Sequence, residues 1–424
     1  MAKSVDFENA VRLCSVASAV VVAMTTASAA IIPLSPTDGA NVSLVPDAQK
    51  AVMSPLTLNE RIEFLRKDRE NGKVIRHDKY WRRARPIVLK WRTTEKERGP
   101  WKIEIGRIPE LSDARVWYVR VNAIDAVSGR DTGRAKSEDE TSYSVPRANL
   151  EIARDYYWRV TARGRCGKWN CGSRCGCKES KRIVRSEISH FRTEDRAPRW
   201  IEIEGDVRNI RDFGGWRTED GHRVRQGMAF RGQGLNNNSV TGERQGRNRL
   251  TVEDVKYLTG MLGIRTDLDL RSKGETADMV ESPLGPGVTF IQHSAPYYAG
   301  IFTAAGKKKM AEIFRTFCNP TNYPIYFHCI GGADRTGSLA YVMLGVLGVS
   351  RHDIETDWES TFYPSIPFKD GKGGIVWNSE LHFEKGLSKY GNPDDSWNHR
   401  IELYLLDCGI SPKEIAGFRS IMLE

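Results

Sequence analysis

The chain has 424 residues, more than one domain usually contains, so we expect two folded units. Its 40% hydrophobic and 28% charged residues exclude a collagen-like, coiled-coil, largely disordered or polytopic membrane protein. The net charge of +10 favours an anionic partner such as nucleic acid, and its position along the chain decides whether that interpretation holds.

The N-terminus has the pattern of an export signal. No charged residue occurs from Leu13 to Thr37, and Lys3 and Arg12 place positive charge before the apolar stretch. An A-x-A motif at residues 27–29 fits signal cleavage. We therefore predict a signal peptide over residues 1–29 and a secreted or periplasmic mature protein. An uncleaved membrane anchor and an ordinary buried helix are the alternatives.

The charge divides the rest of the chain into two parts. Residues 31–198 carry 35 basic and 23 acidic side chains, whereas residues 199–424 carry 27 and 29. The two parts meet at a Pro-containing joint, residues 196–199, where we place a domain boundary. The basic excess belongs to the first part and no nucleic-acid motif accompanies it, so we expect an anionic surface or glycan as its partner and no nucleic acid.

The first part is predicted to be all-β. Residues 86–91, 101–105 and 115–121 are short runs rich in Val, Ile, Trp and Tyr. Residues 156–162 alternate apolar and polar, Leu150 lies six residues before Tyr156, and residues 191–193 form the expected last strand. This pattern resembles the fibronectin type III domain, in which a Leu and a corner Tyr introduce an alternating strand. The resemblance implies an immunoglobulin-like β-sandwich over residues 50–198.

Four cysteines gather between the last two predicted strands. Cys166, Cys171, Cys175 and Cys177 fall within twelve residues. Two local disulfides are the first interpretation for an exported protein, and a zinc site of four thiolates is the alternative. The surrounding basic side chains fit either an anionic-surface contact or a solvated loop; they are Arg163, Arg165, Lys168, Arg174, Lys178, Lys181, Arg182 and Arg185.

The strongest motif occupies residues 323–337. An apolar strand ends at His328 and Cys329, a Gly-containing loop follows, and residues 338–347 form an apolar helix pattern. Loop amides and a helix N-terminus converge on an anion in such an arrangement. The same positive field favours ionisation of a thiol, so we expect Cys329 to be a thiolate nucleophile. Arg335 follows six residues later and can bind two phosphate oxygens, and Thr336 is expected to hydrogen-bond the sulfur.

The motif resembles the Cys-x5-Arg protein tyrosine phosphatase superfamily, and within it the bacterial-type branch with the loop H-C-x-x-G-x-D-R-T-G. Residues 209–215, 264–272 with Glu275, and 357–359 resemble further segments of that branch. The resemblance implies an α/β tyrosine-phosphatase-like domain over residues 199–424 that hydrolyses phosphomonoesters without a metal or cofactor. The implied substrate-binding residues are Ile330, Gly331, Gly332, Ala333 and Thr336.

The general acid has two candidates, because the W-P-D segment of the familiar tyrosine phosphatases is missing. The resemblance implies Asp334, inside the loop. Asp269, at the end of its predicted strand, is the rival, or it is structural and pairs with Arg271 or Arg231. Ala333 stands where the branch often has Lys, which makes recognition of multiply phosphorylated inositol lipids less favourable.

The sequence therefore predicts an exported, cysteine-dependent phosphatase that forms a phosphocysteine and acts on a phosphorylated protein or small phosphoester, with phosphotyrosine as the expected substrate. An inositol-phosphate hydrolase of phytase type or a phosphoinositide phosphatase is the alternative. A surface or glycan-binding protein with an inert phosphatase fold is the alternative of another class. Cys318 and Cys408 are candidates for a disulfide with each other.

Overall fold

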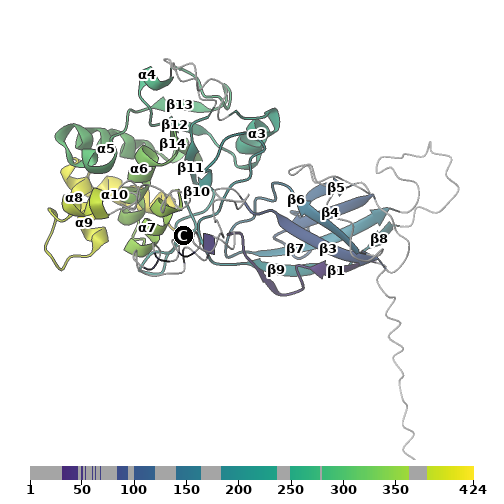
Figure 1. Cartoon of the computed structure of the whole chain (residues 1–424). Coiled ribbons are helices and arrows are strands. Elements are labelled where there is room, and N and C mark those ends of the chain that lie inside the picture. Colours follow the sequence, from purple (N-terminus) through teal and green to yellow (C-terminus); the bar gives the residue numbers. More distant parts are fainter. Residues whose placement is uncertain are drawn as a thin grey trace, which may run out of the picture.

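The computed structural model describes residues 31–45, 49–50, 53, 60, 63, 67, 84–93, 100–119, 140–163, 183–235, 249–276, 279–361 and 380–424. The predicted signal peptide and the four-cysteine segment lie outside these residues. Figure 1 shows a β-rich N-terminal part beside a mixed α/β part. Among the described helices, none combines the length and the apolar character that a membrane span requires.

The N-terminal part consists of two β-sheets that share one apolar core. One sheet has the strand order β1-β3-β6, and the other has the order β2-β9-β7-β4-β5, with β8 beside β7. The side chains of Trp91 on β3 and Trp101 on β4 meet edge to face, 5.4 Å apart, between the sheets. The strands are β1 (Ile31–Ser35), β2 (Ala40–Val42), β3 (Ile87–Thr93), β4 (Trp101–Gly106), β5 (Arg115–Val119), β6 (Glu140–Val145), β7 (Asp155–Arg163), β8 (Ile183–Arg185) and β9 (Ser189–Thr193).

The five strands predicted here correspond to β3, β4, β5, β7 and β9. The structure adds β1 and β2, which precede the predicted start of the domain at residue 50. It also adds β6, whose sequence ETSYSV is mostly polar. β6 pairs along its whole length with β3, so cross-strand pairing rather than its own apolar pattern makes it a strand.

The C-terminal part contains a five-stranded sheet with the order β10-β11-β14-β12-β13. β14 is central and runs parallel to both neighbours, and only the edge strand β10 is antiparallel among the described strands of this sheet. Parallel strands bring their carboxyl ends to one edge, which is where ligands bind in α/β folds. The strands are β10 (Arg211–Asp212), β11 (Ala229–Gln233), β12 (Thr266–Asp269), β13 (Thr289–Gln292) and β14 (Ile325–Cys329).

Helices cover both faces of this sheet, so it forms the middle of three layers (Figure 1). Successive β14 side chains point to opposite faces: Phe327 packs with the helices on one face, whereas Tyr326 packs with η3 and neighbouring loops on the other. The helices are α3 (Val252–Lys256), η3 (Tyr257–Met261), α4 (Lys273–Thr276), η4 (Tyr298–Phe302), α5 (Ala304–Phe317), η5 (Pro320–Asn322), α6 (Asp334–Val346), α7 (Arg351–Ser360), η7 (Glu380–Glu384), α8 (Lys385–Leu387), α9 (Trp397–Asp407) and α10 (Pro412–Met422).

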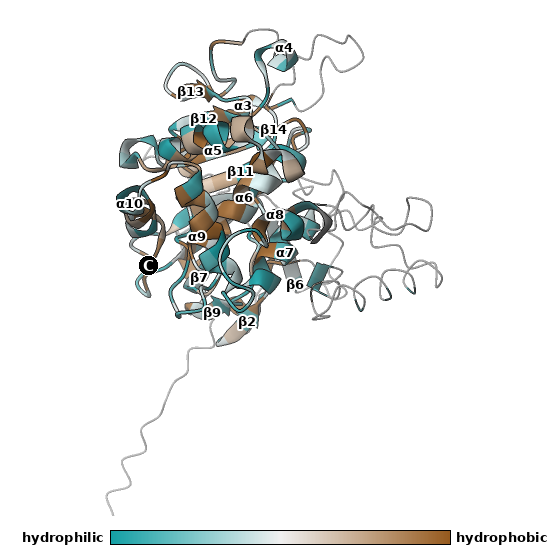
Figure 2. Cartoon of the chain, turned by 90° about the vertical axis from the view of Figure 1, so that its left-hand side faces the viewer, coloured by the Kyte–Doolittle hydropathy of each residue, from teal (hydrophilic) through white to brown (hydrophobic). Residues whose placement is uncertain are grey.

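The central helix α6 carries the largest share of this core. Eleven of its thirteen residues are buried, from Thr336 to Val346. A helix that is apolar all round requires neighbours on every side. Figure 2 shows this helix largely in brown, between the sheet and helices of mixed brown and teal. The sequence prediction of an apolar helix in this region is confirmed.

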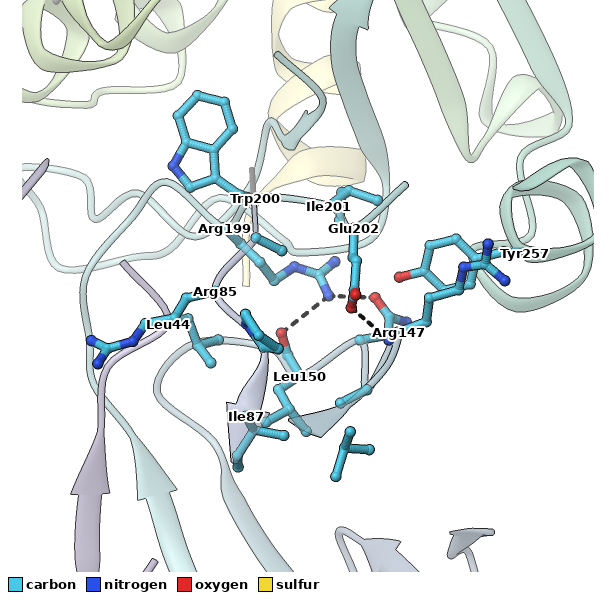
Figure 3. Close-up of a pocket in the computed structure, with 15 residues that line it drawn as sticks. Leu44, Arg85, Ile87, Arg147, Leu150, Arg199, Trp200, Ile201, Glu202 and Tyr257 are labelled. Atoms are coloured by element: carbon cyan, nitrogen blue, oxygen red, sulfur yellow. Dashed lines mark hydrogen bonds between the residues drawn. The ribbon is translucent and has the colours of Figure 1, made fainter. Parts of the chain in front are cut away.

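The two parts of the chain are joined by a well-packed interface. Ile152 of the β-rich part is fully buried in the core of the α/β part, and its backbone N–H and C=O bond the side chain of Gln226 at 2.8 and 3.0 Å. The Arg199 guanidinium is buried and donates to Asp212 and to the carbonyl of Leu150. A cavity of about 40 Å³ remains beside these groups (Figure 3).

Candidate active site

The predicted nucleophile occupies the end of the central strand. Cys329 is the last residue of β14 and is 2% exposed. It lies opposite Gln233 of β11, and the preceding His328 lies opposite Asp269 of β12. The strand that the sequence predicts before the loop is thereby confirmed, and its end coincides with the carboxyl edge of the sheet.

The helix after the loop begins earlier than the sequence pattern suggests. α6 starts at Asp334 rather than at Ser338, because Asp334, Arg335 and Thr336 form its first turn. Ala333, at the N-cap position before this helix, makes no side-chain capping bond, whereas a Ser or Thr side chain caps each of α5, α7, α9 and α10. The first N–H groups of α6 therefore lack the usual capping partner and point towards the loop, as an anion site requires.

Side chains behind the loop hold its carbonyl groups. Asn209 donates to the carbonyl oxygens of Gly331 at 3.2 Å and Gly332 at 3.1 Å, and Arg231 donates to Gly332 at 3.1 Å. Gly332 has a φ of +66°, and a Cβ at this position would lie 2.4 Å from the backbone of Gly232. Glycine is therefore required here. Because these carbonyl oxygens accept hydrogen bonds from side chains behind the loop, its amide N–H groups can face an anion on the other side.

A buried charge cluster supports Asn209 and Arg231. The Asp357 carboxylate binds the guanidinium of Arg211 at 2.9 Å and also that of Arg231, and all three side chains are buried. Burial raises the pKa of Asp357, but the two guanidinium groups outweigh it and the net shift is downwards. One carboxylate thus faces two cations, which leaves an excess of positive charge behind the loop.

These supporting residues had no predicted role. The sequence indicated Asn209, Arg211 and Asp357 only as parts of segments that resemble the phosphatase family. Asn209 has a φ of +60°, and its partner Gly331 is 122 residues away along the chain. Polar residues in an otherwise apolar neighbourhood were the available signal, but periodicity does not reveal such a long-range contact.

Arg335 is held by Glu275 of α4. Its two terminal nitrogens donate to the two carboxylate oxygens at 2.6 and 2.7 Å, in the paired geometry that fixes a planar guanidinium. Ser272 donates to the same carboxylate from its backbone N–H and its hydroxyl. The hydrogen bond from Arg335 lowers the pKa of Glu275 to about 2, so this carboxylate is ionised at all physiological pH values. Arg335 is thereby presented in one orientation.

Asp269, the rival general acid, belongs to a second buried network. It accepts hydrogen bonds from the backbone N–H and the guanidinium of Arg271, which is one of the two partners predicted for a structural Asp269. Burial raises the pKa of Asp269, but His328 and Arg271 lower it more. His328 binds Asp267 at 2.8 Å; burial lowers its pKa, and the carboxylates of Asp269 and Asp267 reverse that shift. Asp269 therefore holds no proton for transfer near neutral pH.

Two predicted residues of the first turn of α6 differ in their surroundings. The Thr336 hydroxyl is buried and has no hydrogen-bond partner within the described part of the chain. The Asp334 carboxylate accepts a hydrogen bond from the hydroxyl of Tyr298. The structure thus brings both residues to the loop that follows Cys329, together with Ile330, Gly331, Gly332 and Ala333.

The predicted disulfide between Cys318 and Cys408 is wrong, because both residues are free thiols. Cys318 contacts the carbonyl oxygen of Glu414 at 3.6 Å instead. Burial raises the pKa of each of the two thiols to about 11. Both cysteines are therefore structural neighbours of the core rather than reactive groups.

Comparison with known proteins agrees with this geometry. The model of the tyrosine phosphatase family matches residues 201–365. Residues 201–365 are therefore similar to tyrosine phosphatases, and the protein is a phosphoric monoester hydrolase that resembles that family. A protein of Cupriavidus necator, named as a candidate tyrosine-protein phosphatase, is 25% identical over 213 residues, which are 43% of this chain and 69% of that protein.

A solved structure is also similar in part. The core catalytic domain of the PP-IP phosphatase Siw14 from S. cerevisiae, crystallised with citrate, is 18% identical and aligns with a TM-score of 0.23. The alignment covers 31% of this chain and 75% of that domain.

Proposed function

We propose that the protein hydrolyses phosphomonoesters through a phosphocysteine at Cys329. The observation that carries this proposal is the loop itself: its carbonyls are bound from behind by Asn209 and Arg231, beside an uncapped helix start. A nucleophile therefore adjoins a cradle of free N–H donors. Such fixed donors stabilise the charge that develops on the phosphoryl oxygens during transfer.

The reaction proceeds in two displacements. The Cys329 thiolate attacks phosphorus, the ester P–O bond breaks, and Asp334 gives its proton to the leaving oxygen. Water then attacks the phosphocysteine and passes a proton to the Asp334 carboxylate. The P–S bond breaks, which releases inorganic phosphate and restores the thiolate. Arg335 binds two phosphoryl oxygens in both steps, and the unpartnered hydroxyl of Thr336 donates to the sulfur as it leaves.

Asp334 rather than Asp269 is the proton donor in this proposal. Asp269 is fully engaged by Arg271 and its pKa is lowered, so it is ionised when a proton is needed. Asp334 lies five residues after the nucleophile, at the free start of α6. A carboxyl group at that position adjoins the bound phosphoryl group.

Phosphotyrosine is the proposed substrate. Cys329 is only 2% exposed, so the phosphate must reach inwards from the molecular surface. An aryl phosphate extends further from its peptide backbone than a phosphoserine does. Ala333 offers no cation for a second phosphate group, which favours a singly phosphorylated substrate over inositol polyphosphates.

The β-rich part is proposed to be a fibronectin type III-like sandwich of the immunoglobulin class. Two sheets around one core support this, and so does the hydroxyl of Tyr156, which accepts a bond from the backbone of Glu151 at 2.8 Å. A Tyr that bonds a few residues upstream is typical of the corner in such sandwiches. Its basic excess suits an anionic surface or glycan, and export rests on the sequence of residues 1–29.

The test uses the full chain and p-nitrophenyl phosphate. We expect Cys329→Ser to abolish turnover, Cys318→Ser to leave it unchanged, and rapidly quenched wild-type enzyme to carry one phosphoryl group on Cys329. Activity in the Cys329→Ser variant, or the absence of a phosphorylated intermediate in an enzyme with a pre-steady-state burst, would contradict the mechanism. An inactive wild-type protein would favour the binding-module alternative.

A further inference from the structure

The surroundings of Asp334 contain a residue that no motif singles out. Tyr298 opens the short helix η4 and donates its hydroxyl hydrogen to the Asp334 carboxylate. Its backbone N–H donates to the Ser338 hydroxyl at 3.0 Å, and Ser338 donates in turn to the carbonyl of Asp334 at 2.8 Å. Tyr298 therefore makes two hydrogen bonds to α6, one from its backbone to Ser338 and one from its side chain to Asp334.

The backbone of Tyr298 is held in an unfavourable conformation. Its φ is +53°, a left-handed value that is rare for a bulky L-residue. Strained residues persist where the surrounding structure fixes them, and they concentrate at functional sites. The bond to Ser338 is one such constraint, because it holds the amide of Tyr298 against α6. The hydroxyl is thereby directed to Asp334.

The ring of Tyr298 is fixed from several sides. It stacks on His382 of η7 with the ring centres 4.0 Å apart, and its edge meets Trp358 of α7 at 5.9 Å. The neighbouring Tyr297 packs against it at 5.0 Å but is half exposed. A ring enclosed in this way cannot swing away without unpacking its neighbours. The hydroxyl group therefore stays at one place.

We propose that Tyr298 is the positioning residue of the general acid: its hydroxyl holds the Asp334 carboxyl group in one orientation at the start of α6. This inference rests on the proposed function, in which Asp334 protonates the leaving group. The Tyr298 hydroxyl remains a donor across the working pH range, because burial and the adjacent carboxylate keep its own pKa well above the usual range.

The titratable groups that face Tyr298 are known. They are Tyr297 beside it, Asp334 of α6, the thiol of Cys329 at the end of β14, and His382 of η7. His382 and Cys329 are present in both wild type and a Tyr298→Phe variant. These groups are therefore common to both proteins, and a difference in activity between the two reports on the hydroxyl.

The experiment compares kcat and KM for two substrates. Phenyl phosphate has a poor leaving group that needs the acid, whereas p-nitrophenyl phosphate needs it little. In Tyr298→Phe, which keeps the ring, we expect kcat for phenyl phosphate to fall about 10-fold at an unchanged KM, with little change for p-nitrophenyl phosphate. Tyr297→Phe is the matched control and should behave as wild type.

A double variant separates this inference from the proposed function. Tyr298→Phe added to Asp334→Asn should cause no further loss, because the hydroxyl acts only through Asp334. An equal loss in both backgrounds, or a loss of the same size for the two substrates, would overturn the role of Tyr298. If Asp334→Asn keeps the wild-type kcat for phenyl phosphate, Asp334 is not the general acid, and the proposed function fails independently of Tyr298.

A second variant serves if Tyr298→Phe melts well below the wild type. Ser338→Ala leaves the Tyr298 ring unchanged and removes the hydrogen bond to the Tyr298 backbone. It should lower kcat for phenyl phosphate by a smaller factor and leave kcat for p-nitrophenyl phosphate unchanged. An unchanged kcat for phenyl phosphate in folded Ser338→Ala would then count against the inference.

Discussion

Replacing Asn209 by Ala tests whether the loop is held from behind. The change removes two hydrogen bonds to the carbonyls of Gly331 and Gly332, worth about 1 kcal/mol each. It also removes the acceptor for Arg211 at 2.6 Å, worth about 2 kcal/mol because the donor is charged. Alanine at a φ of +60° costs about 1 kcal/mol more. We therefore expect the variant to be about 5 kcal/mol less stable.

The effect on catalysis is the more specific part of this prediction. Without Asn209 the carbonyls of the loop lose their anchor, so its amides no longer point at one place. Displacement of catalytic groups by about 1 Å costs about 100-fold in rate, and we expect a loss of this size in kcat. Urea unfolding measures the stability, and kcat is measured with p-nitrophenyl phosphate well below the unfolding transition.

Asn149 provides the matched control for Asn209. It also has a left-handed backbone, with a φ of +49°, and its side chain accepts from Arg199 at 2.9 Å. It lies at the junction of the two parts of the chain rather than behind the loop. Asn149→Ala should lower stability by about 3 kcal/mol and leave kcat unchanged. A folded Asn209→Ala with wild-type kcat, or an equal loss in Asn149→Ala, would refute the reasoning.

Three further predictions concern other parts of the molecule. Glu275→Gln releases Arg335 and should lower kcat/KM about 10-fold. Because the pKa of Glu275 is lowered to about 2, the Glu275–Arg335 pair stabilises the fold fully above about pH 4 to 5, and this stabilisation is lost as the pH falls towards about 2. The melting temperature measured as a function of pH tests this. Ile152→Ala should cost about 3 kcal/mol in urea unfolding without a change in kcat, and a slower enzyme would mean that the interface reaches the loop. Iodoacetamide at pH 7 should inactivate the enzyme while Cys318 and Cys408 stay unmodified by mass spectrometry, because their pKa values are raised; early labelling of either would contradict their burial.

The strand, loop and helix around the nucleophile were predictable because the signal is local. β14 is a run of apolar residues, and α6 continues with apolar residues on every face. The order of glycines, Asp334 and Arg335 between them specifies an anion site. The strands of the β-rich part with clear Val, Ile, Trp and Tyr runs were predictable for the same reason.

The groups that orient the loop were not predictable because their contacts are distant in sequence. Asn209 reaches Gly331 only after the sheet has formed, and Tyr298 reaches Asp334 across 36 residues. Neither contact leaves a periodic pattern. β6 was not predicted for a related reason, because its polar sequence forms a strand through its pairing with β3.

The buried cluster of Arg211, Arg231 and Asp357 has a consequence for folding itself. Two guanidinium groups share one carboxylate, so this buried cluster carries one more positive than negative charge behind the loop. A bound phosphate dianion in the adjoining loop offsets that charge in the native state alone. Inorganic phosphate at 100 times its dissociation constant then stabilises the fold by about 2.7 kcal/mol. The proposed product of the reaction is thus expected to stabilise the fold as a ligand, and urea unfolding at increasing phosphate concentration measures this effect.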